Sequence, residues 1–517
     1  MLVRIKNWIK NNLPLVLILS LSIFLLLFRI NYRTFWMDET MILNYFHQGI
    51  FEFIAEYIRF PDNHPPLYYF LALMVSKVLP WSELTVRLIS ILSGFGIVLL
   101  TYRFTYRVTN AKKTALLTAF FTAFSSYFIL ISQMARYHSF AGLSALLAMY
   151  YFYRLYVEGY EKKLWVYYLG ALILTGYVDY PHFIYAVLIT NAFILYRTIR
   201  TQAIVTFKNW FLGNLLVAVA CTPLAWMLYH RIFIQGDGGW ENVNLLGNSL
   251  VNIFAGILFH IYVFFFGENI FPWNYVIFTI GCLALGGMLV GLVKLIQKRQ
   301  VSRPGIFVVM LFLVSIMVNT VFMNVMNPRY NFTVYPKFGF VAYALGVMVF
   351  VLCISSVTSK KIQNTLFIAW LLVASAGLYH FYTANNYLNP SYFRTFESFE
   401  YVRDASQEGD YLAITPDASE GLYLFYKESY LENVTPLDWK NFQSSTMLVS
   451  SRVWFFSTGE DGEGESVTTE KKVPEGYKII ERFDSVPLDP VFKELKEKFL
   501  HRPSYTYKYT VFLLEKI

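Results

Sequence analysis

The stretch "LPLVLILSLSIFLLLFRINYRTFWMDETMILNYF", residues 13–46, joins a long apolar run to an acidic pair. The run is about as long as a helix that spans a bilayer. No small-residue cleavage site follows it, so we interpret it as a first membrane-spanning helix and not as a signal peptide. Asp38 and Glu39 lie shortly after its end. The pair therefore has two interpretations, a helix cap and a catalytic site.

The rest of the chain is also strongly apolar. Its 517 residues are 56% hydrophobic and 15% charged, with a mean hydropathy of +0.44, whereas soluble domains carry about 25% charged residues. This composition predicts a polytopic α-helical membrane protein. Cys221, Cys282 and Cys353 lie in apolar runs without a CxxC pair, so neither disulfides nor a zinc site is predicted. The net charge of +9 comes from short basic clusters, which favour topology signals over nucleic-acid binding.

Eleven apolar runs predict about eleven spanning helices, with further interfacial helices in the outer loops. Two other runs, 67–79 and 250–266, are assigned to the outer interface, because if both crossed, the basic segments 102–113 and 198–208 would lie outside. This arrangement predicts a plasma (inner) membrane protein with a cytoplasmic N-terminus. The runs begin near Pro14, Val86, Thr114, His138, Trp165, Phe183, Trp210, Tyr275, Gly305, Thr333 and Ile362.

The composition becomes polar from about residue 385. Strand-like runs follow at 411–416, 452–457 and 509–514, and residues 489–500 have a helical pattern. We therefore predict two domains: a transmembrane domain over 1–384, whose first outer loop is 31–83, and an α/β domain over 385–517. An odd number of spans makes the second domain extracytoplasmic.

The predicted topology gathers unusual polar residues at the outer membrane face. Ionisable side chains near hydrocarbon are expensive, so each is a functional candidate. A carboxylate can accept a proton from an attacking nucleophile, and arginines can bind a phosphate. The candidates are Asp38, Glu39, Asp62, His64, Arg87, Gln133, Arg136, Tyr137, Asp179, His182, Arg329 and Tyr330.

These residues together predict transfer of a group from a lipid-linked phosphate. The sequence has no Walker A motif and no Gly-rich βαβ fingerprint, so a nucleotide donor has no evident binding loop. An outward-facing site also lacks access to cytoplasmic nucleotide sugars. The expected donor is therefore a sugar carried on polyprenyl phosphate.

Several candidates have structural alternatives. Asp38 is a good N-cap for an amphipathic interfacial helix over residues 39–58, and Glu39 would favour the positive end of the same helix. Arg87 and Arg136 could extend their charged ends to the interface. His64 and His182 lack HxxxH or HExxH spacing, so no metal and no cofactor is predicted.

Five short motifs resemble the membrane glycosyltransferases of the GT-C class. The resemblance is to the dolichyl-phosphate-mannose protein mannosyltransferase group, with the bacterial lipid A aminoarabinose transferases as relatives. It covers roughly residues 10–350 and is strongest in the first 150. The motifs are "WMDET" (36–40), "DNHPPLYY" (62–69), "SELTVRLIS" (82–90), "SQMARYHSF" (132–140) and "NPRY" (327–330).

The resemblance implies a GT-C fold and an inverting sugar transfer. In that family the aspartate of the first outer loop is the catalytic base, a role that falls on Asp38. The family's HPP element falls on residues 64–66, its arginine at the second span on Arg87, and its late arginine near the donor phosphate on Arg329. The chain shows no counterpart of a β-trefoil insertion. The acceptor therefore stays open among a lipid, a glycan and a protein.

Two other functions fit parts of the sequence. A transporter or flippase of lipid-linked saccharides would also need arginines near a phosphate, but transporters often have paired halves with polar groups at the membrane midplane. Here the polar residues lie at one face and no such symmetry is visible. A sensor would leave the acidic pair and "HPPLYY" unexplained. The expected partners are the lipid-linked donor, its acceptor and membrane lipids, without nucleic acid.

Overall fold

A computed structural model describes most of the chain. The described residues are 10–31, 35, 37–46, 48–62, 64–159, 161–201, 204–234, 249–297, 303–326, 335–383, 396–414, 431–437, 442, 451–458, 473–487, 491, 494, 498 and 507–517.

The first half of the described chain is helical. Its helices are α2 (Leu13–Leu27), α3 (Met37–Phe46), α4 (Ile50–Arg59), α5 (Leu67–Ser76), α6 (Glu83–Thr109), α7 (Lys112–Ala123), α8 (Ser126–Gln133), α9 (His138–Val157), α10 (Lys162–Val178), α11 (Tyr180–Thr201), α12 (Ile204–Ala220), α13 (Thr222–Tyr229) and the π-helical turn η1 (His230–Ile234).

Further helices precede a small sheet. They are α14 (Ser249–Phe266), α15 (Tyr275–Gln297), α16 (Arg303–Met326), α17 (Tyr335–Phe338), α18 (Phe340–Ser356), α19 (Lys360–Thr383) and α20 (Phe396–Ala405), and the strands are β1 (Asp410–Ile414), β2 (Val434–Pro436), β3 (Arg452–Thr458), β4 (Tyr477–Pro487) and β5 (Tyr507–Lys516).

The chain divides into two compact units. A helical unit comprises residues 1–28, 49–74 and 87–381, and a second unit comprises 29–48, 75–86 and 382–517. The second unit thus combines the C-terminal region with two pieces of the first predicted outer loop. The domain boundary between residues 384 and 385 stays a prediction.

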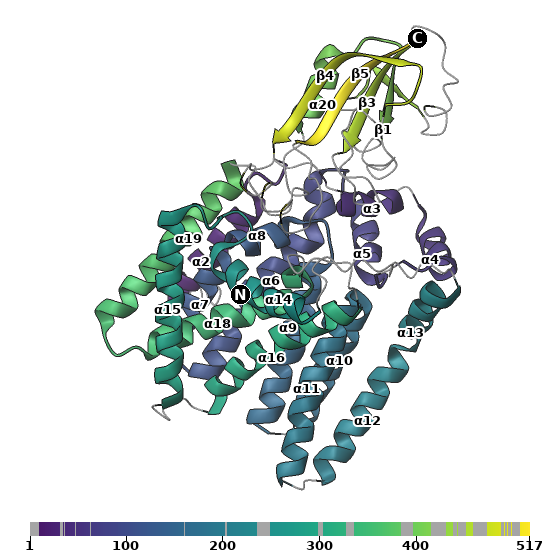
Figure 1. Ribbon diagram of the computed structural model, residues 1–517. Coiled ribbons are helices and arrows are strands. Elements are labelled where there is room, and N and C mark those ends of the chain that lie inside the picture. Colours follow the sequence, from purple (N-terminus) through teal and green to yellow (C-terminus); the bar gives the residue numbers. More distant parts are fainter. Residues whose placement is uncertain are drawn as a thin grey trace. The chain divides into compact units, whose positions relative to one another are not determined.

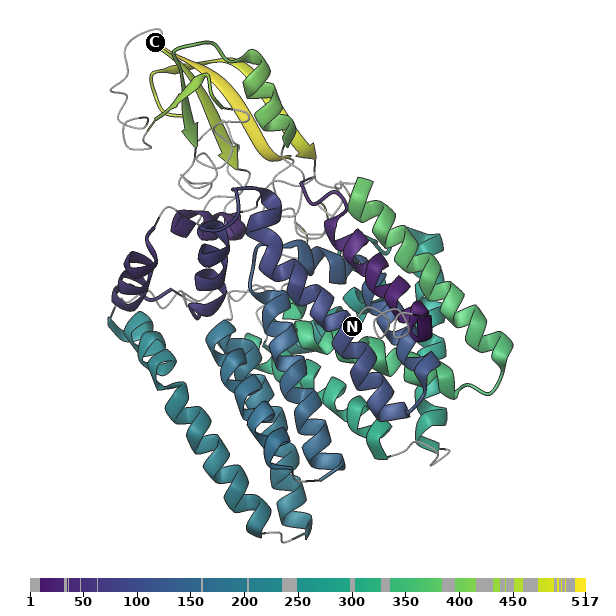
Figure 2. The same ribbon diagram turned by 180° about the vertical axis from the view of Figure 1, so that it is seen from behind.

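The helical unit belongs to a multi-pass membrane protein. Four described helices are long and apolar enough to cross a bilayer, over 83–109, 275–297, 305–324 and 360–383. The number rises to at most six if two bent pairs each count as one span: α7 meets α8 at 60°, and α12 meets α13 at 51°. In both views α10 and α11 run side by side (Figures 1 and 2). The count of eleven spans and the interfacial assignment of 67–79 and 250–266 stay predictions.

The break between α7 and α8 carries the chain into the interior of the helical unit. Ser125 has an extended backbone there, and its hydroxyl accepts the Phe128 N–H at 3.4 Å, as an N-cap does. Every residue of α8 is buried. The turn that follows, before α9, therefore holds its side chains inside the protein.

The predicted interfacial helix over residues 39–58 is wrong as one element, because α3 ends at Phe46 and α4 begins at Ile50. Gly49 has an extended backbone, and its N–H donates to the Glu52 carboxylate at 3.1 Å, which starts a new helix. Asp38 is the second residue of α3. It therefore lies in the first turn and not at the N-cap, which has a non-helical backbone.

The C-terminal sheet has the strand order β2-β1-β3-β5-β4. β1 pairs in parallel with β2 and β3, whereas β5 is antiparallel to both β3 and β4. The strands predicted at 411–416, 452–457 and 509–514 are confirmed as parts of β1, β3 and β5. The predicted helix over 489–500 lies largely outside the described residues, of which only 491, 494 and 498 fall in it.

Alternating side chains of β3 cover both faces of this sheet, as the period of a strand requires. Val453 and Phe455 belong to a buried cluster with Phe512 of β5. On the other face, Phe456 stacks on Phe399 of α20 at 5.2 Å between ring centres. Figure 1 shows α20 lying along the sheet. The region is therefore a small α/β fold, as predicted.

Candidate active site

A buried arginine lies in the turn between α8 and α9. The side chain of Arg136 is 4% exposed. Its Nη1 donates to Tyr69 Oη at 3.2 Å, and its Nη2 lies 3.2 Å from His64 Nε2. The guanidinium carbon also lies 5.2 Å from the centre of the Tyr137 ring. Because the guanidinium is planar with donors in fixed directions, these contacts fix its plane.

The backbone of the same turn is held from α5 and α6. Ser90 Oγ donates to the Arg136 carbonyl at 2.9 Å, and Tyr68 Oη lies 2.9 Å from that serine oxygen. A serine hydroxyl has one hydrogen, so Tyr68 is the donor in the second bond. Tyr68, which belongs to the "HPPLYY" stretch, therefore helps to hold the backbone of this turn through Ser90.

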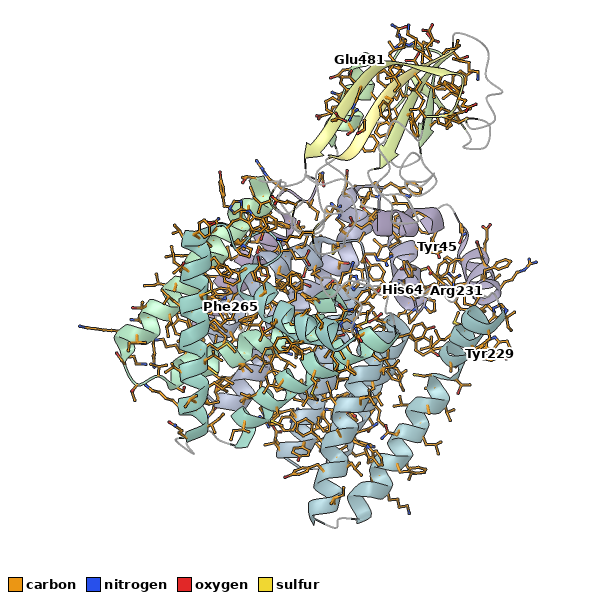
Figure 3. All side chains as sticks on the ribbon, in the orientation of Figure 1. Tyr45, His64, Tyr229, Arg231, Phe265 and Glu481 are labelled. Atoms are coloured by element: carbon orange, nitrogen blue, oxygen red, sulfur yellow. The ribbon has the colours of Figure 1, made fainter. Side chains whose placement is uncertain are left out.

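His64 is held in one tautomer by the arginine. An arginine nitrogen can only donate, so His64 Nε2 accepts and the ring carries its hydrogen on Nδ1. Burial lowers the pKa of His64 well below its ordinary value, and the charges of Arg136, Lys337 and Arg231 lower it further. Arg231 is bound beside it through the Pro61 carbonyl at 3.3 Å. Figure 3 shows His64 and Arg231 on neighbouring segments.

The His64 contact predicts a loss of stability in acid. The folded protein disfavours protonated His64, so this contribution is present above the unfolded pKa of about 6.5 and is lost as pH falls below it. We expect the melting temperature in detergent to fall more between pH 7 and pH 5 for the wild type than for His64→Gln. The glutamine oxygen can accept from Arg136 without titrating. Parallel pH curves for the two proteins would contradict this prediction.

A buried lysine, Lys337, lies on α17 and is 6% exposed. Its charge contributes to the lowered pKa of His64. The neighbouring Phe338 ring lies 5.4 Å from the ring of His138, which in turn lies 4.4 Å from Tyr137. We call His64, Tyr69, Arg136, Tyr137 and Lys337 the arginine cluster.

Glu268 adds a buried carboxyl near this lysine. It lies in the loop between α14 and α15 and is 5% exposed. Burial raises the pKa of Glu268 to about 8, and the Lys337 charge opposes that shift. Neither Lys337 nor Glu268 was among the site residues predicted from the sequence, and His138 was not among them either. The available signal was a single acid inside the apolar "FFFGENIF" stretch, residues 264–271.

Asp179 and His182 form a second buried pair, at the junction of α10 and α11. Asp179 Oδ2 lies 2.5 Å from His182 Nδ1, and both side chains are fully buried. The Tyr185 ring lies 5.1 Å from the His182 ring. Both residues were separate candidates in the sequence, and the structure brings them into contact.

The structure also describes four other predicted site residues. Arg87, at the start of α6, is 2% exposed, and Asp62 is partly buried. Asp38 and Glu39 lie on α3 in the second unit, where Glu39 is 3% exposed. Arg329 and Tyr330 lie outside the described residues.

Gln133 has a structural role that the sequence did not reveal. Its amide donates to the carbonyls of Leu26 and Phe28, at 3.1 and 3.2 Å. These carbonyls lie at the C-terminal end of α2, where the last carbonyls of a helix accept hydrogen bonds from other groups. Gln133 therefore satisfies the end of the first apolar helix.

Metal binding has no candidate in the part of the chain that the structure describes. No three His, Cys, Asp or Glu side chains there are grouped so that they could hold an ion. The expectation that the protein uses no metal stays a prediction.

Comparison with known proteins gives a family match over the first half of the helical unit. Residues 63–226 match the model of the dolichyl-phosphate-mannose-protein mannosyltransferase family. This segment contains His64, Arg136 and the Asp179–His182 pair, and it begins after Asp38. No curated protein sequence matches the chain.

Two solved structures share the fold over nearly their whole length. ArnT from Cupriavidus metallidurans bound to undecaprenyl phosphate has 10% sequence identity and a TM-score of 0.54, covering 96% of this chain and 97% of its own. The apo state of that protein has 9% identity and a TM-score of 0.55, covering 99% and 98%. The fold is therefore helical and GT-C-like, with a small sheet.

The family match and the fold agree with the resemblance seen in the sequence motifs. The chain resembles the GT-C membrane glycosyltransferases, in the group that includes the mannosyltransferases and ArnT. A glycosyltransferase-type function is the class that these likenesses support.

Proposed function

We propose that this protein transfers a sugar from a polyprenyl-phosphate donor to a lipid, glycan or protein acceptor at the outer face of the plasma (inner) membrane. The arginine cluster carries the proposal, because it holds two buried cationic side chains, Arg136 and Lys337, inside a helical membrane unit. Such cations bind phosphate strongly where water is excluded. The bound undecaprenyl phosphate of ArnT supports a lipid phosphate as the carrier.

The proposed reaction inverts the configuration at the sugar C1 carbon. An oxygen or nitrogen of the acceptor attacks C1 while the bond from C1 to the phosphate oxygen breaks. The electron pair of that bond stays on the oxygen and leaves polyprenyl phosphate, whose negative charge Arg136 and Lys337 stabilise. The proton of the acceptor passes to the carboxylate of Asp38, with Glu39 beside it, as the sequence resemblance implies.

Transfer can be tested with membranes that contain the full-length protein. The substrates are undecaprenyl-phosphate-linked mannose, glucose and arabinose, each with a radioactive sugar, added with extracted lipids and cell-surface glycans. We expect label to leave the carrier only when the protein is present. A flippase would move the lipid and leave the sugar bond intact. Label that stays on the carrier for every donor would contradict the proposal.

The proposed orientation predicts opposite accessibility for two positions. Single cysteines at Ser391 and Ser302, in a background without Cys221, Cys282 and Cys353, should react with an impermeant maleimide from opposite sides of the membrane. The basic clusters favour a cytoplasmic N-terminus. With an odd number of spans, Ser391, which follows the last span, is then expected on the outside. Labelling of both positions from one side would contradict the eleven-helix topology.

A further inference from the structure

The junction of α10 and α11 contains a helix cap with additional chemistry. Asp179 has an extended backbone, and its Oδ2 accepts the backbone N–H of His182 at 3.1 Å. This is the bond that an N-cap aspartate makes to the third residue of a helix. The same Oδ2 lies 2.5 Å from His182 Nδ1. These two contacts therefore account for Asp179 Oδ2 and for His182 Nδ1.

Capping leaves two polar atoms unexplained. Asp179 Oδ1 and His182 Nε2 are buried and have no hydrogen-bond partner among the residues that the structure describes. Both side chains have 0% exposure. A buried polar atom without a partner loses stability and calls for an explanation. Helix capping by Asp179 therefore does not explain why His182 Nε2 is buried without such a partner.

The chemistry of these two atoms restricts what can satisfy them. A carboxylate oxygen only accepts, so Oδ1 needs a donor. Nε2 accepts in the neutral ring and donates in the charged ring. A hydroxyl group suits both atoms in either state, whereas a phosphate oxygen would be repelled by the carboxylate. The pair is therefore suited to a ligand rich in hydroxyl groups.

The pair also lies close to the surface of the helical unit. The two residues between its members, Tyr180 and Pro181, are partly exposed. Tyr180 is held to the Leu224 carbonyl by a long bond of 3.4 Å.

We propose that the Asp179–His182 pair binds the hydroxyl groups of the transferred sugar and so distinguishes the sugar-bearing donor from the sugar-free carrier. This inference rests on the proposed function, since it assigns the sugar to this pair and the phosphate to the arginine cluster. His182 contacts the sugar, and Asp179 both contacts it and fixes the orientation of the imidazole ring.

The test compares two classes of lipid on the purified full-length protein. Dissociation constants are measured for undecaprenyl phosphate and for a panel of undecaprenyl-phosphate-linked hexoses and pentoses. The quantity of interest is the ratio between the sugar-free and the sugar-bearing lipid. The wild type is expected to favour at least one sugar lipid by about tenfold or more, the scale of one or two hydrogen bonds to a buried group.

Asp179→Asn and His182→Leu are expected to reduce that ratio by about tenfold while leaving the affinity for undecaprenyl phosphate unchanged. His182→Gln should retain part of the ratio, because its amide can occupy the place of Nε2. Asparagine is itself a good N-cap, so α11 should persist in Asp179→Asn. Thr105→Val is a matched control, since its buried hydroxyl likewise lacks a partner among the described residues but lies on α6.

The outcomes separate this inference from the proposed function. An unchanged ratio in Asp179→Asn and His182→Leu would overturn it and would indicate that water satisfies the two atoms. Equal weakening of both lipids would indicate a structural role and would also overturn it, as would a wild type without preference for any sugar lipid. A wild type that binds neither undecaprenyl phosphate nor any sugar lipid would instead refute the proposed function itself.

Discussion

Replacing Asp38 with asparagine is expected to reduce sugar transfer by about a hundredfold to ten-thousandfold, the usual contribution of a general base. Asparagine has nearly the same shape as aspartate but cannot accept the proton of the acceptor. Asp38 lies in the first turn of α3, where a carboxylate is favoured by the helix dipole. Its assignment rests on the "WMDET" motif, since the family match begins at residue 63.

The measurement is the initial rate of label transfer from the donor that the wild type uses, at equal protein content in the membrane. Donor binding by Asp38→Asn should stay near the wild-type value, because the substitution removes a base and not a phosphate contact. Glu39→Gln is the matched control for loss of one neighbouring charge and should reduce the rate much less. A near-normal rate in Asp38→Asn would remove this residue from the mechanism.

Local sequence patterns predicted those parts of the fold and site that short segments determine. β1, β3 and β5 were recognisable because each contains a short run rich in apolar, aromatic and β-branched residues. β4 was missed although "YKIIERF" has strand character, because its solvent-exposed side chains weaken the apolar signal. The pairing of Asp179 with His182 was also accessible, since the two residues are three positions apart.

Contacts between distant segments could not be read from the sequence. Lys337 and His64 are separated by more than two hundred residues, and their proximity depends on how α17 packs in the helical unit. The same limit applies to Gln133. Its amide donates a hydrogen bond to a carbonyl at the end of α2 and so has a structural role instead of the predicted role at the outer face. Gly49 shows a different limit. The apolar pattern continued through it, but its extended backbone and its bond to the Glu52 carboxylate start α4 as a separate helix.

Arg136→Lys is expected to weaken binding of undecaprenyl phosphate by about tenfold to a hundredfold, because charge-assisted hydrogen bonds contribute about 1.5–3 kcal/mol. Lysine retains the charge, but one ammonium group cannot reproduce the guanidinium geometry that joins Tyr69 Oη to His64 Nε2, each at 3.2 Å. The bidentate contact that a guanidinium offers to a phosphate is lost as well. The loss of affinity should be equal for sugar-free and sugar-bearing lipids. Asp179→Asn, in contrast, should leave the affinity for the sugar-free lipid unchanged.

The matched control for this substitution is Arg107→Lys. Arg107 also forms a short ion pair, with its Nε 2.5 Å from Glu158 Oε1, but its side chain is 49% exposed. An exposed pair contributes little and is screened by salt, so this variant should bind the lipid as the wild type does. Lipid affinity and melting temperature are measured together on both variants. If Arg136→Lys lowers only the melting temperature and leaves the affinity unchanged, Arg136 is a structural residue and the phosphate must bind elsewhere.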